Sequence, residues 1–201
     1  MSDIRHIVIV GAGECGVRAA LTLRDAGFDG DITLVHGEAG TPYERPPLSK
    51  PTHDDVIRRS IMGIERFSSE HISVLDDHWA INIDRRARIV TLAGGKILSY
   101  DRLLLATGAQ PRRLMIDGHI CADVHVFRNF SDAKRIFDEL SSDKRLTIIG
   151  GGFIGLELAA AARQRQVSTT VIEVASRLLA RAVPASLAAR IEARHRDHLV
   201  H

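Results

Sequence analysis

The chain begins with a pattern of apolar and polar positions that is typical of alternating strands and helices. The run from His6 to Val10 is apolar and β-branched, which favours a strand buried on both faces. After Gly16, apolar residues recur at helical spacing up to Gly27, and a second strand-like run covers 32–35. The order of strand, helix and strand predicts a βαβ unit with parallel strands.

The same pattern returns in the second half of the chain. Residues 145–149 form an apolar strand-like run, 156–162 carry a helical apolar face, and 167–172 form another strand-like run. A basic helix is predicted over 184–198, and 199–201 begin a further element. The chain therefore contains a second βαβ unit, which we expect to be incomplete.

Short β-like runs lie between the two βαβ units. A β-meander is predicted over 78–83, 88–92 and 96–98, with turns at 84–86 and 93–95. A further buried strand is predicted over 103–105. The segment from Asp54 to Phe67 is weakly helical, and Ser131 is expected to cap a helix that runs to Leu140.

These elements predict an α/β fold with two Rossmann-like, three-layer dinucleotide-binding units and a small β-meander. The stretch from Gly40 to Pro51 is rich in proline, which excludes a central strand or a helix interior. We interpret it as a stiff loop. A sheet that stops after the second βαβ strand leaves an unpaired edge and an uncovered apolar face, so we expect the chain to be less stable than its length suggests and to bind a ligand poorly or to associate.

The first glycine motif indicates nucleotide binding. Gly11 permits a sharp turn, Gly13 lets the backbone approach a pyrophosphate, and Gly16 allows close packing of helix and strand. The phosphates would lie at the amino end of the helix, and Glu38 would accept a hydrogen bond from a ribose hydroxyl. The glycine pattern alone is weak evidence, but here the strands, the helix and the acid follow in order.

The second motif consists of Gly150, Gly152, Gly155 and Glu173. Gly150 and Glu173 are 23 positions apart, and the corresponding first pair is 27 apart, close to the separation of about 20 that the fingerprint needs. Two motifs favour two dinucleotides; a duplication kept for structure alone is the alternative. Glu173 favours NAD, because an acidic side chain repels the 2′-phosphate of NADP. Arg177 lies nearby in the sequence, so NADP stays an alternative.

Composition narrows the class of protein. The 201 residues are 45% hydrophobic and 26% charged, as in a globular protein, and the net charge of +2 is too small to indicate nucleic acid. The two cysteines form no C-x-x-C pair, and no histidine motif indicates a metal site. We expect no signal peptide, no membrane segment and a cytoplasmic protein; the oligomeric state is not indicated.

Four motifs together resemble a known family. They are Gly11-x-Gly13-x-x-Gly16, Pro42-Tyr-Glu-Arg-Pro-Pro-Leu-Ser-Lys50, Leu105-Ala-Thr-Gly108-Ala109 and Gly150-x-Gly152-x-Ile-Gly-Leu-Glu157. This combination resembles the FAD-dependent pyridine-nucleotide oxidoreductases, and among them the NADH–ferredoxin reductase components of bacterial oxygenase systems. The family's chain is considerably longer, so the resemblance implies a fragment, a truncated reading frame or one half of a split enzyme.

The resemblance implies a role for each matching residue. Residues 1–112 would be the first segment of an FAD-binding domain, and 113–201 an incomplete NAD-binding domain. NADH would be bound by Gly150, Gly152, Gly155 and Glu173. FAD would be bound by Gly11, Gly13, Gly16, Glu38, Arg45, Lys50, Ala80, Thr107, Gly108, Ala109 and Arg128.

Lys50 and Glu157 are the predicted catalytic residues. Glu157 follows Leu156 and precedes Leu158, so its carboxylate is either at the surface or a buried charge that needs a partner. The resemblance brings it to Lys50 beside the flavin, and we expect their charged atoms within about 4 Å. A solvated loop lysine is the alternative for Lys50.

The function that these observations predict is transfer of a hydride from NADH to FAD and of electrons to a ferredoxin-type iron–sulfur protein. The cofactors supply the chemistry, and the protein positions them. A catalytically inactive nucleotide-binding fragment, or half of a split reductase, is the first alternative. An NADH-dependent redox sensor is the second.

Overall fold

The structure is a computed structural model that describes residues 4–51, 55–121 and 124–201. The chain forms two compact units. We call Met1–Glu44 with Arg59–Gln110 the first unit, and Arg45–Arg58 with Pro111–His201 the second unit. The main difference from the sequence-based division concerns 45–58, which packs with the second unit because the 3-10 helix η1 (Pro46–Ser49) lies against helices of that unit.

A four-stranded parallel sheet forms the centre of the first unit. Its strands are β1 (His6–Val10), β2 (Asp31–Val35), β3 (Ile72–Leu75) and β7 (Arg102–Leu105), in the order β3-β2-β1-β7. Ile9 of β1 is in register with Leu34 of β2 and Leu104 of β7. The predicted parallel pairing of the first two strands is confirmed.

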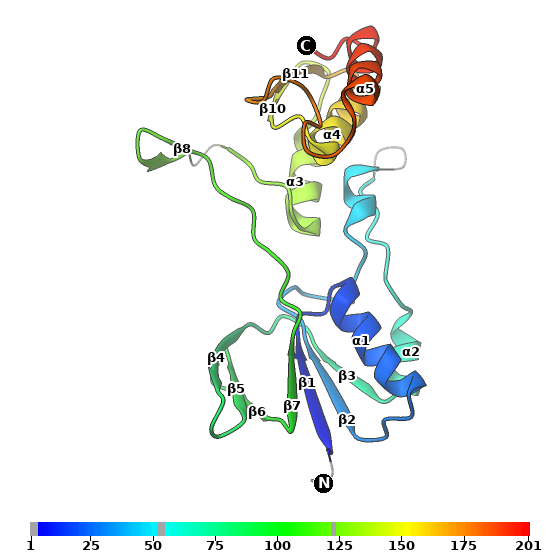
Figure 1. The fold of residues 1–201 in the computed structure, drawn as a ribbon, viewed down its shortest axis with the longest axis vertical. Helices are drawn as coiled ribbons and strands as arrows, with labels where there is room; N and C mark the ends of the chain where they lie inside the picture. The colour runs from blue at the N-terminus through cyan, green and yellow to red at the C-terminus, as the bar shows by residue number, and fades with distance from the viewer. Residues whose placement is uncertain (1–3, 52–54, 122–123) are drawn as a thin grey trace. The chain divides into compact units, whose positions relative to one another are not determined.

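The sheet of the first unit is covered on both faces, which explains why β1 is apolar from Ile7 to Val10. Helices α1 (Glu14–Asp25) and α2 (Ile64–Ser69) lie on one face (Figure 1). The antiparallel sheet of β4 (Ala80–Asp84), β5 (Ile89–Leu92) and β6 (Ile97–Ser99) lies on the other. Val8 and Val10 pack with Val90 and Leu92 of β5, whereas Ile9 packs with Val17 of α1. The predicted β-meander is confirmed.

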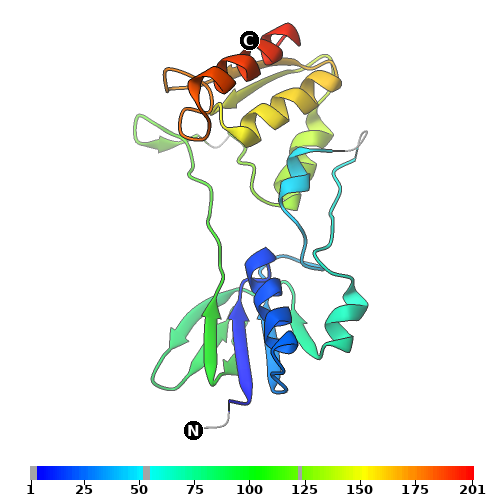
Figure 2. The ribbon, with the colours of Figure 1, turned by 45° about the vertical axis from the view of Figure 1, so that its right-hand side comes forward.

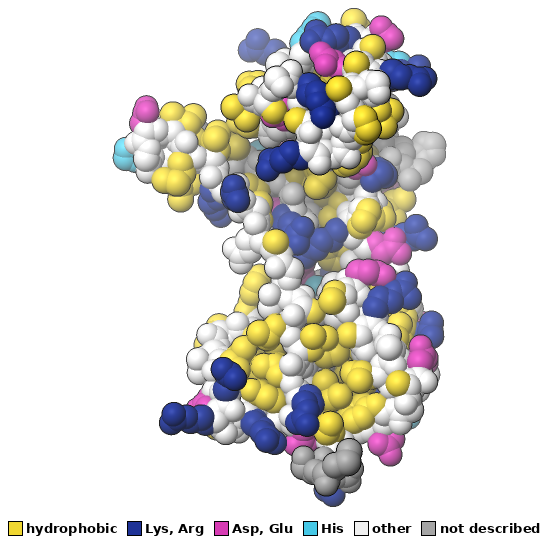
Figure 3. Space-filling model, viewed as in Figure 1, with side chains coloured by type: hydrophobic (Ala, Val, Ile, Leu, Met, Phe, Trp, Pro, Cys, Tyr) yellow, Lys and Arg dark blue, Asp and Glu magenta, His cyan; other side chains and the backbone are white. Residues whose placement is uncertain are grey.

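Strand β7 is less buried than its sequence suggests. It is the outermost described strand on its side of the sheet, and Leu105 at its end is exposed. Hydrophobic side chains reach the surface of the first unit where Figure 1 places β1 and β7 (Figure 3). The run 103–105 is therefore a half-buried edge strand of the described sheet.

The second unit repeats the βαβ arrangement with a smaller sheet. Strands β10 (Arg145–Ile149) and β11 (Ser168–Ile172) are parallel, and α4 (Phe153–Gln164) connects them. Helix α5 (Ala185–Asp197) lies beside α4 in both ribbon views (Figure 2). The unit also holds α3 (Phe130–Glu139) and a hairpin of β8 (Met115–Ile116) and β9 (His119–Ile120). The α/β, Rossmann-like fold class is confirmed.

The last residues of the chain extend the second sheet. Val200 forms a parallel bridge with Thr169 of β11, and the N–H of Val171 donates to the carbonyl of His201 at 2.7 Å. Residues 200–201 therefore lie beside β11 as β3 lies beside β2 in the first unit. The Thr169–Val200 bridge corresponds to the pairing of Ile32 with Ile72.

Two predictions of local structure are wrong. Helix α2 begins only at Ile64, and the described residues 55–63 are not helical; Ile61 N–H donates to the Pro42 carbonyl, so tertiary pairing overrides the weak helical pattern. Residues 52–54 lie outside the described chain. The cap of α3 is Asn129 rather than Ser131, because Asn129 and Asp132 bond each other's backbone N–H groups in a capping box.

Candidate functional site

The glycine turn of the first unit connects the carboxyl end of β1 to the amino end of α1. Gly11 adopts a φ of +108°, and a Cβ atom on it would lie 2.1 Å from the carbonyl oxygen of Ala106. A Cβ on Gly16 would lie 1.9 Å from the carbonyl oxygen of Gly11. Both positions therefore exclude any side chain, and the turn is as tight as the sequence predicts.

Gly13 differs from these two glycines because the space beside it is open. A Cβ atom placed on Gly13 meets nothing within 4 Å. Gly13 is also the N-cap of α1, and no side-chain hydrogen bond caps it. The first backbone N–H groups of α1 therefore face an open space that suits an anion such as a pyrophosphate.

The second glycine turn repeats this geometry between β10 and α4. Gly150 has a φ of +113°, and a Cβ on Gly155 would lie 2.1 Å from the carbonyl oxygen of Gly150. A Cβ on Gly152 meets nothing within 4 Å, and no side chain caps α4 there. No acidic residue occupies the first turn of α4. The second turn therefore offers the same site for an anion.

Glu173 follows β11 directly and is bonded to the second turn. Its Oε2 accepts from the Gly151 N–H at 2.8 Å, and its Oε1 accepts from the Ala175 N–H at 2.8 Å. The Ala175 and Gly151 amides hold the pKa of the Glu173 carboxyl below its ordinary value. A carboxylate has about four acceptor positions, so Glu173 can still accept from ribose hydroxyls. Its predicted place beside the glycine turn is confirmed.

Arg177 is not available to a 2′-phosphate in this arrangement. Its Nη2 donates to the carbonyls of Ala180 at 2.9 Å and Val183 at 3.0 Å, and its Nη1 contacts two further carbonyls of the same loop. The loop folds back so that the Leu179 N–H donates to the Gly151 carbonyl at 3.0 Å. Arg177 thus fixes the loop that carries Glu173, a role that the sequence did not reveal.

Glu38 lies beyond the carboxyl end of β2, as predicted, but not at the position equivalent to Glu173. The first residue after β2 is His36, which is buried, whereas Glu38 is two residues further on. The Glu38 carboxylate accepts a hydrogen bond from the Tyr43 hydroxyl. The contribution of Tyr43 was missed because only the fold brings it back to Glu38.

The other predicted residues of the first unit lie at the ends of its strands. Ala106 after β7 donates its N–H to the Val10 carbonyl at 2.8 Å, which sets the segment Thr107–Ala109 next to the Gly11 turn. Gly108 has a φ of +71°. Ala80 begins β4. The carboxyl ends of neighbouring parallel strands are the usual place of ligands in such sheets.

Lys50 and Glu157 meet within the second unit. The Lys50 Nζ lies 2.9 Å from Glu157 Oε2, which confirms the predicted ion pair. The Ser49 hydroxyl donates to the same carboxylate oxygen, and Lys50 Nζ also contacts the Pro46 carbonyl at 3.1 Å. The Glu157 side chain is 30% exposed and that of Lys50 56%, so neither charge is fully buried. The contact of Ser49 with Glu157 was not predicted from the sequence. The position of Ser49 next to Lys50, in the same proline-rich loop, was the feature that could have indicated it.

Two predicted arginines also lie in the second unit. Arg45 Nη1 donates to the carbonyl of Arg128 at 2.7 Å. The Nε of Arg128 is buried and has no hydrogen-bond partner among the described residues. An arginine N–H without a partner is costly, and an anion such as a phosphate would satisfy it.

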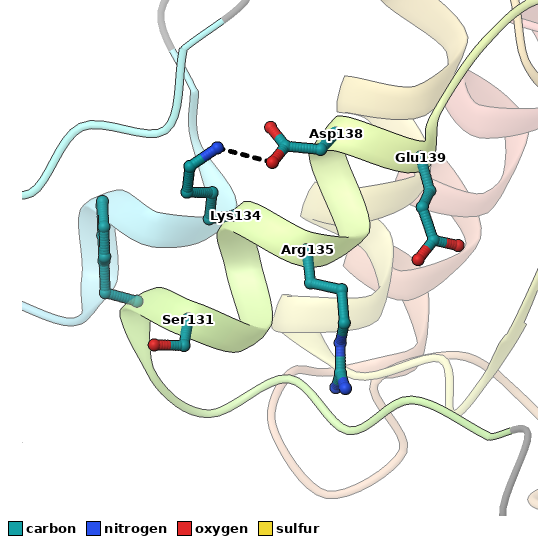
Figure 4. A pocket seen from close by; sticks show the side chains of 6 residues that line it. Ser131, Lys134, Arg135, Asp138 and Glu139 are labelled. Carbon is teal, nitrogen blue, oxygen red and sulfur yellow. Dashed lines mark hydrogen bonds and ion pairs between the residues drawn. The ribbon is translucent and has the colours of Figure 1, made fainter.

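Helix α3 borders a shallow hollow that does not belong to these sites. Its lining comes from Phe130, Ser131, Lys134, Arg135, Asp138 and Glu139 of the helix itself (Figure 4). Lys134 and Asp138 already pair with each other at 2.5 Å. In the described parts of the chain, no group of three or more His, Cys, Asp or Glu could hold a metal, and no helix is long and apolar enough to cross a membrane.

Comparison with known proteins agrees with this geometry. The chain is 40% identical over 198 residues to rhodocoxin reductase of Rhodococcus erythropolis, covering 97% of this chain and 46% of that protein. It is 41% identical over 196 residues to the ferredoxin–NAD(+) reductase component of the p-cumate 2,3-dioxygenase system of Pseudomonas putida, covering 96% and 49%. The chain thus spans about half the length of these relatives.

Solved structures give the same result. The ferredoxin reductase of Rhodopseudomonas palustris superposes with a TM-score of 0.90 at 33% identity, over 98% of this chain and 50% of that one. Putidaredoxin reductase, in its covalent complex with putidaredoxin, superposes with a TM-score of 0.86 at 34% identity, over 98% and 48%. The family model described as pyridine nucleotide-disulphide oxidoreductase matches residues 5–201. The chain therefore belongs to the pyridine nucleotide-disulphide oxidoreductase family.

Proposed function

We propose that the chain is the nucleotide-binding half of a flavoprotein reductase that takes a hydride from NADH and delivers electrons to a ferredoxin-type iron–sulfur protein. The observation that carries the proposal is the repeated glycine turn. Gly13 and Gly152 each leave open space above uncapped helix N–H groups, while Gly16 and Gly155 are sterically closed to any side chain. Two such turns suit two dinucleotides.

FAD is the proposed ligand of the first unit. The tight Gly11–Gly16 turn and the adjacent Thr107–Ala109 segment support this assignment. Glu38 and Ala80 are proposed to bind its ribose and adenine. The resemblance assigns Arg45, Lys50 and Arg128 of the second unit to FAD as well, and the unpartnered Nε of Arg128 supports an anionic ligand there.

NADH rather than NADPH is the proposed ligand of the second unit. Glu173 is fixed beside the turn with its pKa lowered by the Ala175 and Gly151 amides, so it stays ionised and repels a 2′-phosphate. Arg177 donates to loop carbonyls instead of facing outward. The NADP reading that the sequence left open is therefore less well supported.

Lys50 and Glu157 are the proposed catalytic pair. When bound, FAD would supply the redox chemistry, which is acceptance of a hydride and release of single electrons. Lys50 would hold positive charge where negative charge develops. Glu157 holds the lysine Nζ in place, and the Ser49 hydroxyl in turn donates to the Glu157 carboxylate. Because the Lys50 ammonium group is already held by Glu157 before the reaction, it would not have to change its position as charge develops.

The names of the relatives support the proposal that a ferredoxin-type protein accepts the electrons. They include rhodocoxin reductase and rubredoxin–NAD(+) reductase, and one solved relative is bound to putidaredoxin. Because this chain spans about half of those proteins, the acceptor, the activity and a cytoplasmic location are all proposals for it. A catalytically inactive nucleotide-binding fragment, or one half of a split reductase, is the alternative.

Visible absorption during anaerobic titration tests the proposal. The purified chain is saturated with FAD, and the flavin band is followed while NADH is added. Bleaching by NADH supports the reductase. FAD binding without bleaching supports the inactive fragment, and no binding of either nucleotide contradicts both.

A further inference from the structure

Trp79 lies directly against the backbone of Gly37 in the first unit. A Cβ atom on Gly37 would lie 2.9 Å from Cε2 of the indole and 3.0 Å from its Cδ2. Gly37 is not in the left-handed region, so the indole rather than the backbone conformation is what excludes a side chain there. Gly37 immediately precedes Glu38, the proposed ligand of the FAD ribose. The indole is therefore next to the adenosine end of the proposed site.

Backbone hydrogen bonds fix the segment that carries Trp79. The N–H of His78 donates to the His36 carbonyl at 3.0 Å, which joins this segment to the loop after β2. The Trp79 carbonyl accepts from the Ala93 N–H at 2.7 Å, which joins it to the turn after β5. The backbone of Trp79 is thus held on both sides.

The topology of the sheet places Trp79 where the base of a dinucleotide would lie. In the order β3-β2-β1-β7, the Gly11 turn follows β1, Glu38 comes after β2, and the segment with Trp79 follows β3. A pyrophosphate at the turn and a ribose at Glu38 direct the base of an ADP group toward the end of β3. Trp79 offers an aromatic ring there and is 56% exposed.

The neighbouring side chain cannot offer such a surface. The side chain of Ala80 packs with the core cluster that includes Val90 and Leu92, so Ala80 can contact a ligand only through its backbone. Packing against Gly37 uses one part of the Trp79 indole, and more than half of the residue's surface stays accessible. The accessible part is large enough to contact a base.

We propose that the indole of Trp79 stacks on the adenine base of FAD and is the side chain by which the first unit holds that base. Stacking suits this pair because a base presents its π-face to an aromatic ring. Gly37 then has a role of its own, because only a residue without a side chain lets the indole occupy this place. The inference rests on the proposed binding of FAD to the first unit, and it adds an interaction that the glycine turns do not require.

The fluorescence of Trp79 tests the inference directly, because Trp79 is the only tryptophan in the sequence. ADP is added to the purified chain, and inorganic pyrophosphate, which has no base, is added separately. We expect ADP to quench the emission and pyrophosphate to leave it unchanged. Emission that stays constant at ADP concentrations that displace FAD would overturn the inference while the FAD site stands. FAD binding with which ADP does not compete would do the same.

Calorimetric titration with FAD compares variants of the chain. Trp79→Ala should bind FAD about tenfold more weakly or worse, which is the loss of one stacked base, and should keep the NADH affinity of the parent chain. Trp79→Phe keeps an aromatic ring and should recover most of the FAD affinity. Ile81→Ala, at a 65% exposed position on β4, is the matched control and should bind FAD as the parent chain does.

Gly37→Ala tests whether Gly37 acts through the indole. Its Cβ would meet the indole at 2.9 Å, so the indole must move and FAD should bind more weakly. In the Trp79→Ala background the same substitution displaces no indole and should change the FAD affinity less than twofold. Equal losses in both backgrounds, or equal FAD affinity of Trp79→Ala and the parent chain, would overturn the inference.

The inference and the proposed function can fail separately in these measurements. If ADP quenches Trp79 but the parent chain binds no FAD, the contact with the base stands and the FAD assignment fails. If neither ADP nor FAD binds, both fail. Circular dichroism of each variant verifies folding, which we expect to persist in Trp79→Ala because the side chain is largely exposed.

Discussion

The Nζ of Lys50 and the Oε2 of Glu157 lie 2.9 Å apart although 107 positions separate the residues in the chain. The contact joins the proline-stiffened segment around η1 to α4 within one unit. Ser49 donates to the same oxygen, so two side chains of one segment converge on a single carboxylate oxygen of the other. Such convergence suits a preorganised charge rather than a chance surface pair.

Replacing Glu157 with glutamine should separate function from stability. Lys50 is more than half exposed, so we expect the free energy of unfolding to fall by less than about 1 kcal/mol. The rate at which NADH bleaches bound flavin should fall more than the affinity for FAD. Urea unfolding, FAD titration and rapid-mixing absorbance measure these three quantities. Asp138→Asn, which breaks the exposed Lys134 pair on α3, is the control and should alter none of them appreciably.

Alanine at Gly16 and alanine at Gly13 should lower the stability by different amounts. A Cβ on Gly16 would lie 1.9 Å from the Gly11 carbonyl oxygen, so Gly16→Ala should lower the free energy of unfolding by about 2 kcal/mol or more. Gly13→Ala adds a methyl group to open space at an N-cap, and about 1 kcal/mol or less is expected. Equal losses in urea unfolding would show that the turn is not packed as described.

Glu173 should make stability depend on pH in the acid range. Its pKa in the folded chain is lowered by the Ala175 and Gly151 amides, whereas an unfolded glutamate has a pKa of about 4.3. The stabilisation is present above the unfolded pKa and is lost as pH falls through the folded pKa. The difference in unfolding free energy between the parent chain and Glu173→Gln should therefore shrink with acidification below about pH 4.3. A difference that is constant or grows with acidification would contradict the assignment.

Two variants test the choice between NADH and NADPH. Glu173→Ala removes the charge that repels a 2′-phosphate, so the ratio of NADH to NADPH affinity should fall. Arg177→Ala frees loop carbonyls and removes no phosphate ligand, so NADH affinity should fall without a gain for NADPH. Calorimetric titration with each nucleotide measures both ratios. A large loss of NADPH binding in Arg177→Ala alone would assign Arg177 to the phosphate.

The sequence predicted the βαβ units well because local signals and burial agree there. The apolar run at β1, the glycine spacing and the helical periodicity of α1 all specify the same element. The Lys50–Glu157 pair was also predicted, but it depended on the family resemblance, since no local pattern joins the two segments. Ser49 and Tyr43 were missed because their partners are set by the fold.

The predictions of the α3 cap and of the α2 start were wrong because tertiary or neighbouring contacts decide between local conformations that the sequence favours about equally. Asn129 and Ser131 are both good capping residues, and the choice depends on Asp132, which closes the capping box with Asn129. The helical pattern ahead of Ile64 is weak, and it yields to pairing between Ile61 and Pro42.

Binding of FAD and NADH to single-glycine variants tests the central claim, that each glycine turn binds its own dinucleotide. Calorimetric titration compares the parent chain, Gly13→Ala and Gly152→Ala, both of which add a methyl group where the structure has open space. We predict that Gly13→Ala loses FAD and retains NADH, and that Gly152→Ala loses NADH and retains FAD. Loss of both nucleotides in either folded variant, or unchanged binding of both in both variants, would contradict two independent sites.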